Sequence, residues 1–514
     1  MPKKSKKGSY EQLRALSKDS ALMISTQALL DWDQETYMPS GAIDFRSQQS
    51  ALLSGQIHKL KVSSKFTRLL SQLIDFASGD FLDPTLTESQ QTAVKEWRRV
   101  YLQDVKLPTA FVKTFATTCS QAVHSWAEAK KNNNFSLFAP HLQKIVTLCQ
   151  KKAALLGYHD HPYDALLDLH EAGMTVKELT PLFERLKIAL TSLLKTLAVK
   201  TQPSTSFLHL EYAPDKQMQF GHLLLTAMGF EKTTSRLDLS SHPFCSGLSV
   251  FDTRMTTRIH PDLLTSNIFS VLHEGGHGLY NKGLPAHEFG TPLCENSSLG
   301  IDESQSRWWE TLIGRSPAFW AHFFPKLQKI FPEQLSSISL DNFTKAINTV
   351  KPSLIRVEAD EVTYCLHIIL RFEIEKALME GSLKVKDLPA AWNQKMKDYL
   401  GIVPPTEAEG CLQDIHWSMG SIGYFPTYAL GNIYAAQFFS SFGNTYPNWQ
   451  ETLSQGDLSF IHKWLYDNIH KHGRLYSPSQ LLLRITNQPL NEKPYIAYLE
   501  KKYHDLYQVH TPSD

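Results

Sequence analysis

The sequence lacks a long apolar run, because no stretch approaches the roughly 18 residues that a helix needs to cross a bilayer. The basic start, MPKKSKKGSY, is not followed by the hydrophobic stretch of a secretory signal. Cysteine is also scarce: six are spread over 514 residues without a CxxC pair, which excludes a disulfide scaffold. We therefore expect reduced thiols and a cytoplasmic protein.

An excess of charge of one sign is missing too, since 52 Lys and Arg face 51 Asp and Glu, for a net charge of +1. This balance offers no global electrostatic argument for a nucleic-acid or membrane partner, and we expect neither. The lysines within residues 1–9 predict a disordered basic tail, with a targeting or nucleic-acid element as the alternative. Hydrophobic residues at 42% and charged residues at 20% are typical of a soluble globular protein.

Helix-start signals recur through the first 200 residues. Asp83-Pro84 predicts a helix that continues to about residue 105, and Pro108 predicts another that ends near residues 131–134. Thr175 stands at capping-box spacing before a long stretch with helical apolar periodicity. The N-terminal part of the chain is therefore predicted to be mostly helical.

Two segments in the middle of the chain predict strands instead. They are residues 206–212 (SFLHLEY) and 248–259 (LSVFDTRMTTRI), both rich in β-branched or aromatic residues. The helical pattern resumes at about residue 261 and continues to the end. No linker is long enough to force a domain boundary. We therefore predict one mainly α domain over residues 10–514, with a small mid-chain β-sheet.

The stretch VLHEGGHGLY (271–280) contains candidate metal-binding and catalytic residues, which the composition does not reveal. On a helix, the i, i+4 spacing of His273 and His277 stacks both imidazoles on one face, close enough to bind one metal ion. Glu274 projects roughly 100° around from His273, beside the metal rather than on it. This is where a general base for the attacking water should lie.

Three glycines in this stretch are costly for a helix. Gly275 and Gly276 each lose about 1 kcal/mol relative to alanine in a helix interior. A helix that a substrate or a neighbouring backbone must approach closely gains from such residues. The alternative is a frayed helix end with Gly278 as its C-cap.

Two imidazoles leave a tetrahedral zinc site short of one protein ligand and an open position, which a downstream carboxylate commonly completes. Glu288 and Glu295 lie in a stretch rich in glycine and proline, where nothing sets their direction. Glu303 lies in a helical pattern with Arg307 at i+4, which can hold its carboxylate ionised and oriented. We therefore prefer Glu303 as the third ligand. An exposed helix salt bridge is the alternative interpretation of this pair.

Taken together, these motifs resemble the carboxypeptidase Taq family of metallopeptidases. The motifs occur in that family's order over nearly the full chain: DWDQETYMP (31–39), HPF (242–244), DTRMT (252–256), HEGGH (273–277), ESQ (303–305), IRVEAD (355–360), GCLQDIHW (410–417) and GYFPTYALGN (423–432). The resemblance implies a mostly helical metallopeptidase fold with a deep active-site groove, a metal-dependent carboxypeptidase activity and a homodimer.

The resemblance also implies residue roles at matching positions. His273, His277 and Glu303 would bind one divalent metal ion per chain, zinc in the first instance, although Co²⁺ or Mn²⁺ suits the same ligands. Glu274 would be the general base. Arg356 would bind the terminal carboxylate of the substrate, since a guanidinium grips a carboxylate bidentately. The alternative for Arg356 is a helix ion pair with the acid at i+4.

Four further residues lie in the last two of these motifs, and Gln413 and His416 match the family's substrate-contacting positions. Gln413 and His416 would contact the substrate, and either Tyr424 or Tyr428 would donate a hydrogen bond to the oxyanion, with a buried aromatic cluster as the alternative for the tyrosines. One departure is Asp302, where the family commonly has histidine; it leaves the ligand count unchanged but alters the local charge.

These observations predict a metallocarboxypeptidase that releases C-terminal amino acids from peptides, with Glu274 accepting the proton of the attacking water. An oligopeptidase that cuts internal bonds would use the same chemistry. A catalytically silent peptide-binding protein is the alternative from another class.

Overall fold

The computed structural model describes residues 8–509, so seven of the nine residues of the predicted basic tail lie outside the described part. The helices are α1 Ser9–Thr36, α2 Ile43–Lys61, α3 Ser64–Leu70, α4 Glu88–Lys106, α5 Thr109–Lys131, α6 Phe135–Leu156, α7 Asp164–Leu167, α8 Val176–Ala198, α9 Pro214–Ala227, α10 Leu264–Gly283, α11 Leu299–Arg307, α12 Pro317–Ile330, α13 Pro332–Leu335, α14 Leu340–Ile347, α15 Tyr364–Glu380, α16 Leu388–Leu400, α17 Pro426–Thr445, α18 Trp449–Ser454, α19 Ser459–Asn468, α20 Pro478–Thr486 and α21 Lys493–Tyr507.

Local side-chain chemistry begins several of these helices where the sequence predicts. Thr175 accepts a hydrogen bond from the backbone N–H of Glu178, whose carboxylate accepts one in return, so the capping box is closed. Helix α5 follows Pro108 and ends at Lys131, as expected. The predicted helix at Asp83-Pro84 is wrong in its start, because α4 begins only at Glu88. The carboxylate of Asp83 instead accepts bonds from the backbone and side chain of Thr85, which forms a turn.

The mid-chain sheet is present, but its strands differ from the prediction. It has three strands in the order β1-β3-β2, with β1 Ser235–Leu239 parallel to β3 Asp252–Thr257 and β2 Cys245–Ser249 antiparallel to β3. Residues 248–259 therefore contribute to two strands. The predicted strand over residues 206–212 is wrong, since residues 206–209 form a 3₁₀ turn. Phe207 and Leu208 are adjacent and both buried, which the alternation of a half-exposed strand does not allow.

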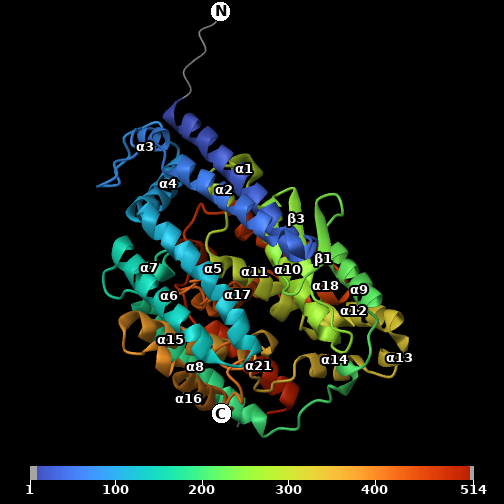
Figure 1. The fold of residues 1–514 in the computed structure, drawn as a ribbon. Coiled ribbons are helices and arrows are strands. Elements are labelled where there is room, and N and C mark those ends of the chain that lie inside the picture. The colour runs from blue at the N-terminus through green and yellow to red at the C-terminus, as the bar shows by residue number, and fades with distance from the viewer. Residues whose placement is uncertain (1–7, 510–514) are drawn as a thin grey trace, which may run out of the picture.

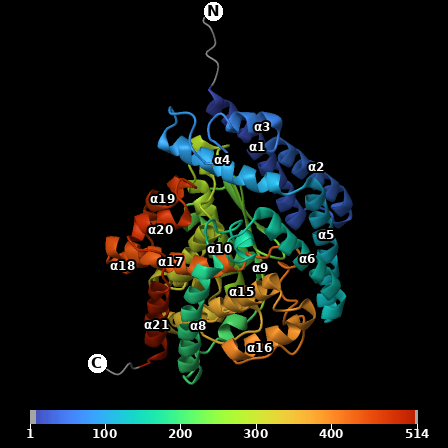
Figure 2. The ribbon, with the colours of Figure 1, turned by 90° about the vertical axis from the view of Figure 1, so that its left-hand side faces the viewer.

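The elements are arranged around α10, α11 and α17. Figure 1 shows these three helices in the interior of the molecule, and α10 packs against both α11 and the sheet. In both Figure 1 and Figure 2, α1 to α4 lie together at one end and α8, α16 and α21 lie together at the other. Buried apolar side chains form one large core and a smaller one between α1, α3 and α4. None of the helices in residues 8–509 combines the length and apolarity needed to traverse a bilayer.

Candidate active site

Helix α10 presents two imidazoles to one cavity. His273 and His277 lie one turn apart on this helix, as their spacing predicts, and their ring centroids are 5.1 Å apart. The cavity that they line has a volume of about 420 Å³ and is also lined by residues of α11, α17 and the segment 243–247. Both imidazoles can therefore reach the same bound group.

Glu303 of α11 supplies a third potential metal ligand next to the two imidazoles. Its Oε2 atom lies 3.8 Å from Nε2 of His273 and 3.6 Å from Nε2 of His277. Metal–ligand bonds of about 2.0–2.2 Å place tetrahedral ligands about 3.4 Å apart, so the three atoms can share one ion. Among residues 8–509, these three side chains form the group of His, Cys, Asp and Glu atoms able to hold a metal, whereas Glu288 and Glu295 are not part of it.

The glycines of α10 allow its neighbours to approach. An ideal Cβ on Gly276 would lie 2.4 Å from the carbonyl oxygen of Gln305, on α11. A Cβ on Gly275 would lie 2.6 Å from the side chain of Met228. The interpretation of Gly278 as a C-cap is wrong, because α10 continues to Gly283. The close contact with α11 holds Glu303 within reach of the imidazoles.

The predicted pairing of Arg307 with Glu303 is present, but it is not an exposed surface salt bridge. Nε of Arg307 donates to Oε1 of Glu303 at 2.7 Å, and the Glu303 side chain is only 6% exposed. Burial alone would raise the pKa of Glu303, but the Arg307 guanidinium and the imidazoles of His273 and His277 together offset it and lower the pKa below its usual value. Glu303 therefore remains a carboxylate.

Each imidazole also faces a carboxylate on its other side. Nδ1 of His273 and Oε2 of Glu310 are hydrogen-bonded at 2.7 Å. Nδ1 of His277 lies 3.1 Å from Oδ2 of Asp302, at ion-pair distance. Carboxylates in this position set the orientation of a metal-binding histidine and raise its basicity. Glu310 lies seven residues after Glu303 in the chain, but no local pattern of the sequence indicates its contact with His273.

Glu274 lies within the same cavity and is 6% exposed. Burial raises the pKa of its carboxyl above the usual value, while the two neighbouring imidazoles act in the opposite direction. A carboxylate with a raised pKa is a better proton acceptor near neutral pH. Its position therefore suits a general base.

Two tyrosines line the side of the cavity that belongs to α17 and the segment before it. The rings of Tyr424 and Tyr428 lie 5.3 Å apart in an edge-to-face arrangement. Burial raises the pKa of Tyr424 to about 12 and that of Tyr428 well above 10, so both hydroxyls keep their protons. Each can donate a hydrogen bond into the cavity.

Arg356 lies behind Tyr428 and is not among the residues that line the cavity. Its Nε and Nη2 atoms donate to Asp414 at 3.1 and 2.8 Å, and Nη1 donates to the hydroxyl of Tyr364 at 3.1 Å. The alternative of a helix ion pair with Asp360 is wrong, because Arg356 lies in a 3₁₀ turn and Asp360 accepts bonds from other groups. Asp414 was missed, although it directly follows Gln413 in the quoted motif.

Gln413 and His416 both lie next to Arg356. The side-chain oxygen of Gln413 accepts from the backbone N–H of Arg356 at 2.9 Å and from Arg371 at 2.8 Å. His416 shares a hydrogen bond of 3.2 Å with the hydroxyl of Tyr428, and burial next to Arg356 lowers its pKa to about 3. Neither residue lines the cavity, so their contact with substrate stays a prediction.

Comparisons with known proteins agree with this geometry. The family model described as carboxypeptidase Taq (M32) metallopeptidase matches residues 12–503. Carboxypeptidase 1 of Bacillus subtilis (strain 168) is 40% identical over 93% of this chain and 95% of its own. Thermostable carboxypeptidase 1 of Thermus thermophilus is 39% identical over 97% of this chain and 99% of its own. The crystal structure of the M32 carboxypeptidase from Deinococcus radiodurans R1 superposes with a TM-score of 0.94 at 36% identity, covering 98% of this chain and all of that one.

Proposed function

The chain belongs to the carboxypeptidase Taq (M32) family of metallopeptidases, and from this premise we infer that it is a metal-dependent carboxypeptidase that hydrolyses peptide bonds. Membership of this family favours that activity over an oligopeptidase or a silent peptide-binding protein. The convergence of His273, His277 and Glu303 on one point is the observation that carries the proposal at atomic level. The substrates we propose are peptides with a free C-terminus.

We propose zinc as the working metal, held by these three side chains, with Co²⁺ and Mn²⁺ as the alternatives. The donor set fits, since two imidazoles and one carboxylate are common zinc ligands and leave a position open. Bound there, the metal would polarise the scissile carbonyl and acidify the attacking water. Metal analysis of freshly purified protein, followed by chelation and addition of single metals, identifies the ion.

The roles of the surrounding side chains follow from their positions. Glu274 accepts the proton of the attacking water and returns it to the nitrogen of the leaving amino acid. The hydroxyl of Tyr424 or Tyr428 donates a hydrogen bond to the developing oxyanion. Asp302 and Glu310 keep the imidazoles oriented.

Arg356 is proposed as the anchor for the terminal carboxylate. A guanidinium has five N–H donors, and three of them are used by Asp414 and Tyr364. Two donors remain for a ligand that approaches past Tyr428, whose ring lies 5.0 Å from the guanidinium carbon. Gln413 and His416 support this proposal by holding Arg356 and Tyr428 in place.

One peptide assayed with a free and with an amidated C-terminus tests the proposed specificity. We expect release of the last residue only from the free form, and we expect a chelator to abolish it. Equal cleavage of both forms at internal bonds would favour an oligopeptidase. Binding without any cleavage would favour a silent peptide-binding protein.

We also propose a homodimer, formed through the outer faces of α1 and α2. Leu22 and Leu29 on α1, and Phe45 and Leu52 on α2, are exposed and lie seven residues apart in each helix, which places each pair on one face. The two helices lie side by side in Figure 1. Light scattering should give twice the chain mass for the native protein, and Phe45→Glu should reduce it. Val199→Glu, on an exposed side chain at the end of α8, is the control.

A cytoplasmic location of the protein stays a prediction.

A further inference from the structure

Tyr364 lies between the proposed metal site and the proposed carboxylate anchor. It is the first residue of α15 and is only 5% exposed. It is not among the residues that line the catalytic cavity. A side chain in this position acts on the reaction through its neighbours and not by touching the substrate.

The ring of Tyr364 covers the guanidinium of Arg307. The guanidinium carbon lies 4.0 Å from the centre of the ring. The face of a tyrosine ring attracts a cation at this distance, and the attraction is stronger when both groups are removed from water. Arg307 is 8% exposed, and its nitrogens donate to Glu303 and Glu310. The ring therefore stabilises the guanidinium that holds the proposed carboxylate ligand.

The hydroxyl of the same side chain accepts a hydrogen bond from a second buried arginine. Nη1 of Arg356 donates to it at 3.1 Å, while Nε and Nη2 of Arg356 donate to Asp414. The donors of a guanidinium are arranged in one rigid plane. Two acceptors at different nitrogens therefore fix the rotation of this plane as well as its position.

The backbone around Tyr364 is fixed by a carboxylate from the same motif as Arg356. Asp360 accepts hydrogen bonds from the backbone N–H groups of Val362 and Thr363 at 2.9 and 3.0 Å, and from the Thr363 hydroxyl at 2.9 Å. The backbone N–H of Tyr364 donates to the carbonyl of Asp360 at 2.9 Å. These bonds close the turn at which α15 begins, so they set the position of Tyr364.

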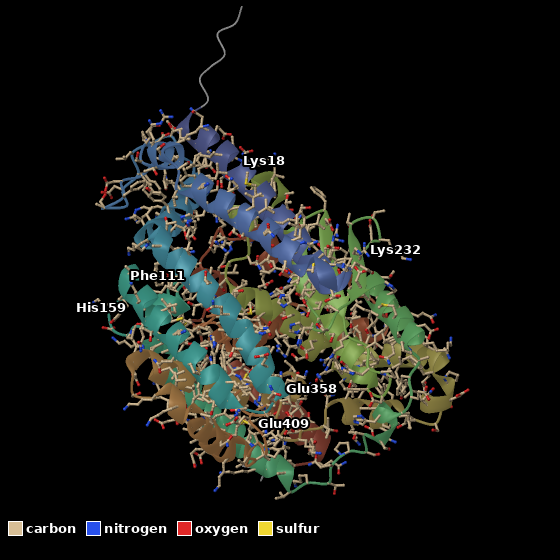
Figure 3. The ribbon with its side chains drawn as sticks, in the orientation of Figure 1. Lys18, Phe111, His159, Lys232, Glu358 and Glu409 are labelled. Carbon is tan, nitrogen blue, oxygen red and sulfur yellow. The ribbon has the colours of Figure 1, made fainter. Side chains whose placement is uncertain are left out.

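A contact between two segments of the chain keeps Arg356 within reach of Tyr364. Arg356 begins a 3₁₀ turn that ends at Glu358, and Gln413 lies four residues after Glu409; Figure 3 labels both glutamates. The side chain of Gln413 accepts from the backbone N–H of Arg356 and donates to the carbonyl of Glu409, both at 2.9 Å. The arginine is therefore held by its backbone as well as by its side chain.

We propose that Tyr364 is a positioning residue shared by the two parts of the active site. Its ring holds Arg307 against the metal ligand Glu303, and its hydroxyl holds Arg356 in the orientation that receives the terminal carboxylate. This inference rests on the proposed function, which assigns the roles of Glu303 and Arg356. Because the ring and the hydroxyl are chemically separable, the two contributions can be removed one at a time.

Tyr364→Phe removes the hydroxyl and keeps the ring. We expect KM for a peptide with a free C-terminus to rise about tenfold, with kcat within about twofold of the wild type, because Arg356 loses a hydrogen-bond acceptor. The affinity for Zn²⁺, measured by competition with a chromophoric chelator in the absence of substrate, should stay within about twofold, because the ring still covers Arg307.

Tyr364→Leu removes the ring as well and keeps an apolar side chain in the core. Arg307 then loses its aromatic partner and orients Glu303 less well, so the affinity for Zn²⁺ should fall about tenfold in addition to the rise in KM. The chelator competition does not depend on activity. Tyr364→Met, which fills more of the buried volume, replaces Tyr364→Leu if the latter does not fold.

Tyr399 offers matched controls. Its ring lies 5.0 Å from Nζ of Lys187 and its hydroxyl donates to Glu373, but it lies on α16 and does not line the catalytic cavity. Tyr399→Phe and Tyr399→Leu therefore remove the same kinds of contact elsewhere in the fold. Both should leave KM and the affinity for Zn²⁺ unchanged.

A double-mutant comparison shows whether the hydroxyl acts through the arginine. In an Arg356→Ala background, Tyr364→Phe should no longer change kcat/KM, because the group that the hydroxyl positions is absent.

The inference is overturned if Tyr364→Phe leaves KM unchanged, if its effect on kcat/KM is the same with and without Arg356, or if removal of the ring lowers thermal stability while the affinity for Zn²⁺ stays at the wild-type value. Failure of the wild-type protein to release a C-terminal residue would instead contradict the proposed function itself.

Discussion

The carbonyl oxygen of Gln305 lies 2.4 Å from the point where a side chain at Gly276 would begin. This contact joins the helix that carries both imidazoles to the helix that carries Glu303. It explains why the helix interior contains Gly276 despite a cost of about 1 kcal/mol relative to alanine, while Gly275 makes room for Met228. The glycine is required for the distance between the helices, and that distance brings Glu303 within reach of both imidazoles.

We expect Gly276→Ala to separate α10 from α11, because the added methyl group meets backbone and not a movable side chain. The free energy of unfolding should fall by about 1–3 kcal/mol, and metal affinity should fall with it. Denaturant unfolding and chelator competition measure the two effects. Gly55→Ala is the matched control: it lies on the exposed face of α2 with open space around it, and it should stabilise by up to about 1 kcal/mol.

Glu274→Gln should leave the metal content unchanged while turnover falls by orders of magnitude. The carboxamide keeps the shape of the side chain but cannot accept the proton of the attacking water. Elemental analysis and the release of C-terminal residues measure the two properties in one preparation. Glu288→Gln, outside the metal-binding group, should be fully active. Substantial activity in Glu274→Gln would rule out the assigned role.

Asp302→Asn should weaken metal binding about 10- to 100-fold, because His277 loses the negative charge 3.1 Å from Nδ1. Competition with a chromophoric chelator measures this directly and does not depend on activity. Asp341→Asn changes an exposed acid on α14 in the same way and should have no effect. An unchanged affinity in Asp302→Asn would show that the ion pair does not contribute to metal binding.

Arg356→Lys should raise KM for peptides with a free C-terminus by about 10- to 100-fold, since lysine keeps the charge but loses the bidentate geometry. Little change in kcat is expected if the carboxylate contact is equally strong in the ground and transition states. If Arg356 only holds Asp414, the variant would instead lose thermal stability with no change in KM.

The buried carboxyl of Glu171 should make the free energy of unfolding depend on pH. Burial raises the pKa of its carboxyl from 4.5 to about 7, although it accepts hydrogen bonds from the backbone of Gly300 and the hydroxyl of Tyr434. The folded state therefore binds more protons than the unfolded state between pH 4.5 and 7. Its free energy of unfolding should fall as pH rises through this window and level off above it.

Glu171→Gln should remove on the order of 3 kcal/mol of this decrease, which urea unfolding at several pH values can measure. The exposed Glu500→Gln provides the comparison and should leave the profile unchanged. An identical profile in Glu171→Gln would mean that the buried carboxyl does not titrate in this range.

Much of the helical architecture could be predicted, because caps and apolar periodicity are local properties of the chain. The capping box at Thr175 and the helix after Pro108 are examples. The strand predicted for residues 206–212 failed because Phe207 and Leu208 are both drawn into the core, where packing overrides the local pattern. The alternative of a helix ion pair for Arg356 is wrong because Arg356 lies in a short turn and pairs with Asp414, which is 58 residues away in the sequence.

The sequence by itself determined that His273, Glu274 and His277 share one helix, since the direction of side chains along a helix follows from its 3.6-residue turn. It also indicated Glu303 through the spacing of Arg307. Only the tertiary structure decided that Gln305 lies on Gly276 and that Asp302 and Glu310 face the two imidazoles. These contacts join segments far apart in the chain, and their geometry is set by how helices pack against one another, which no local periodicity encodes.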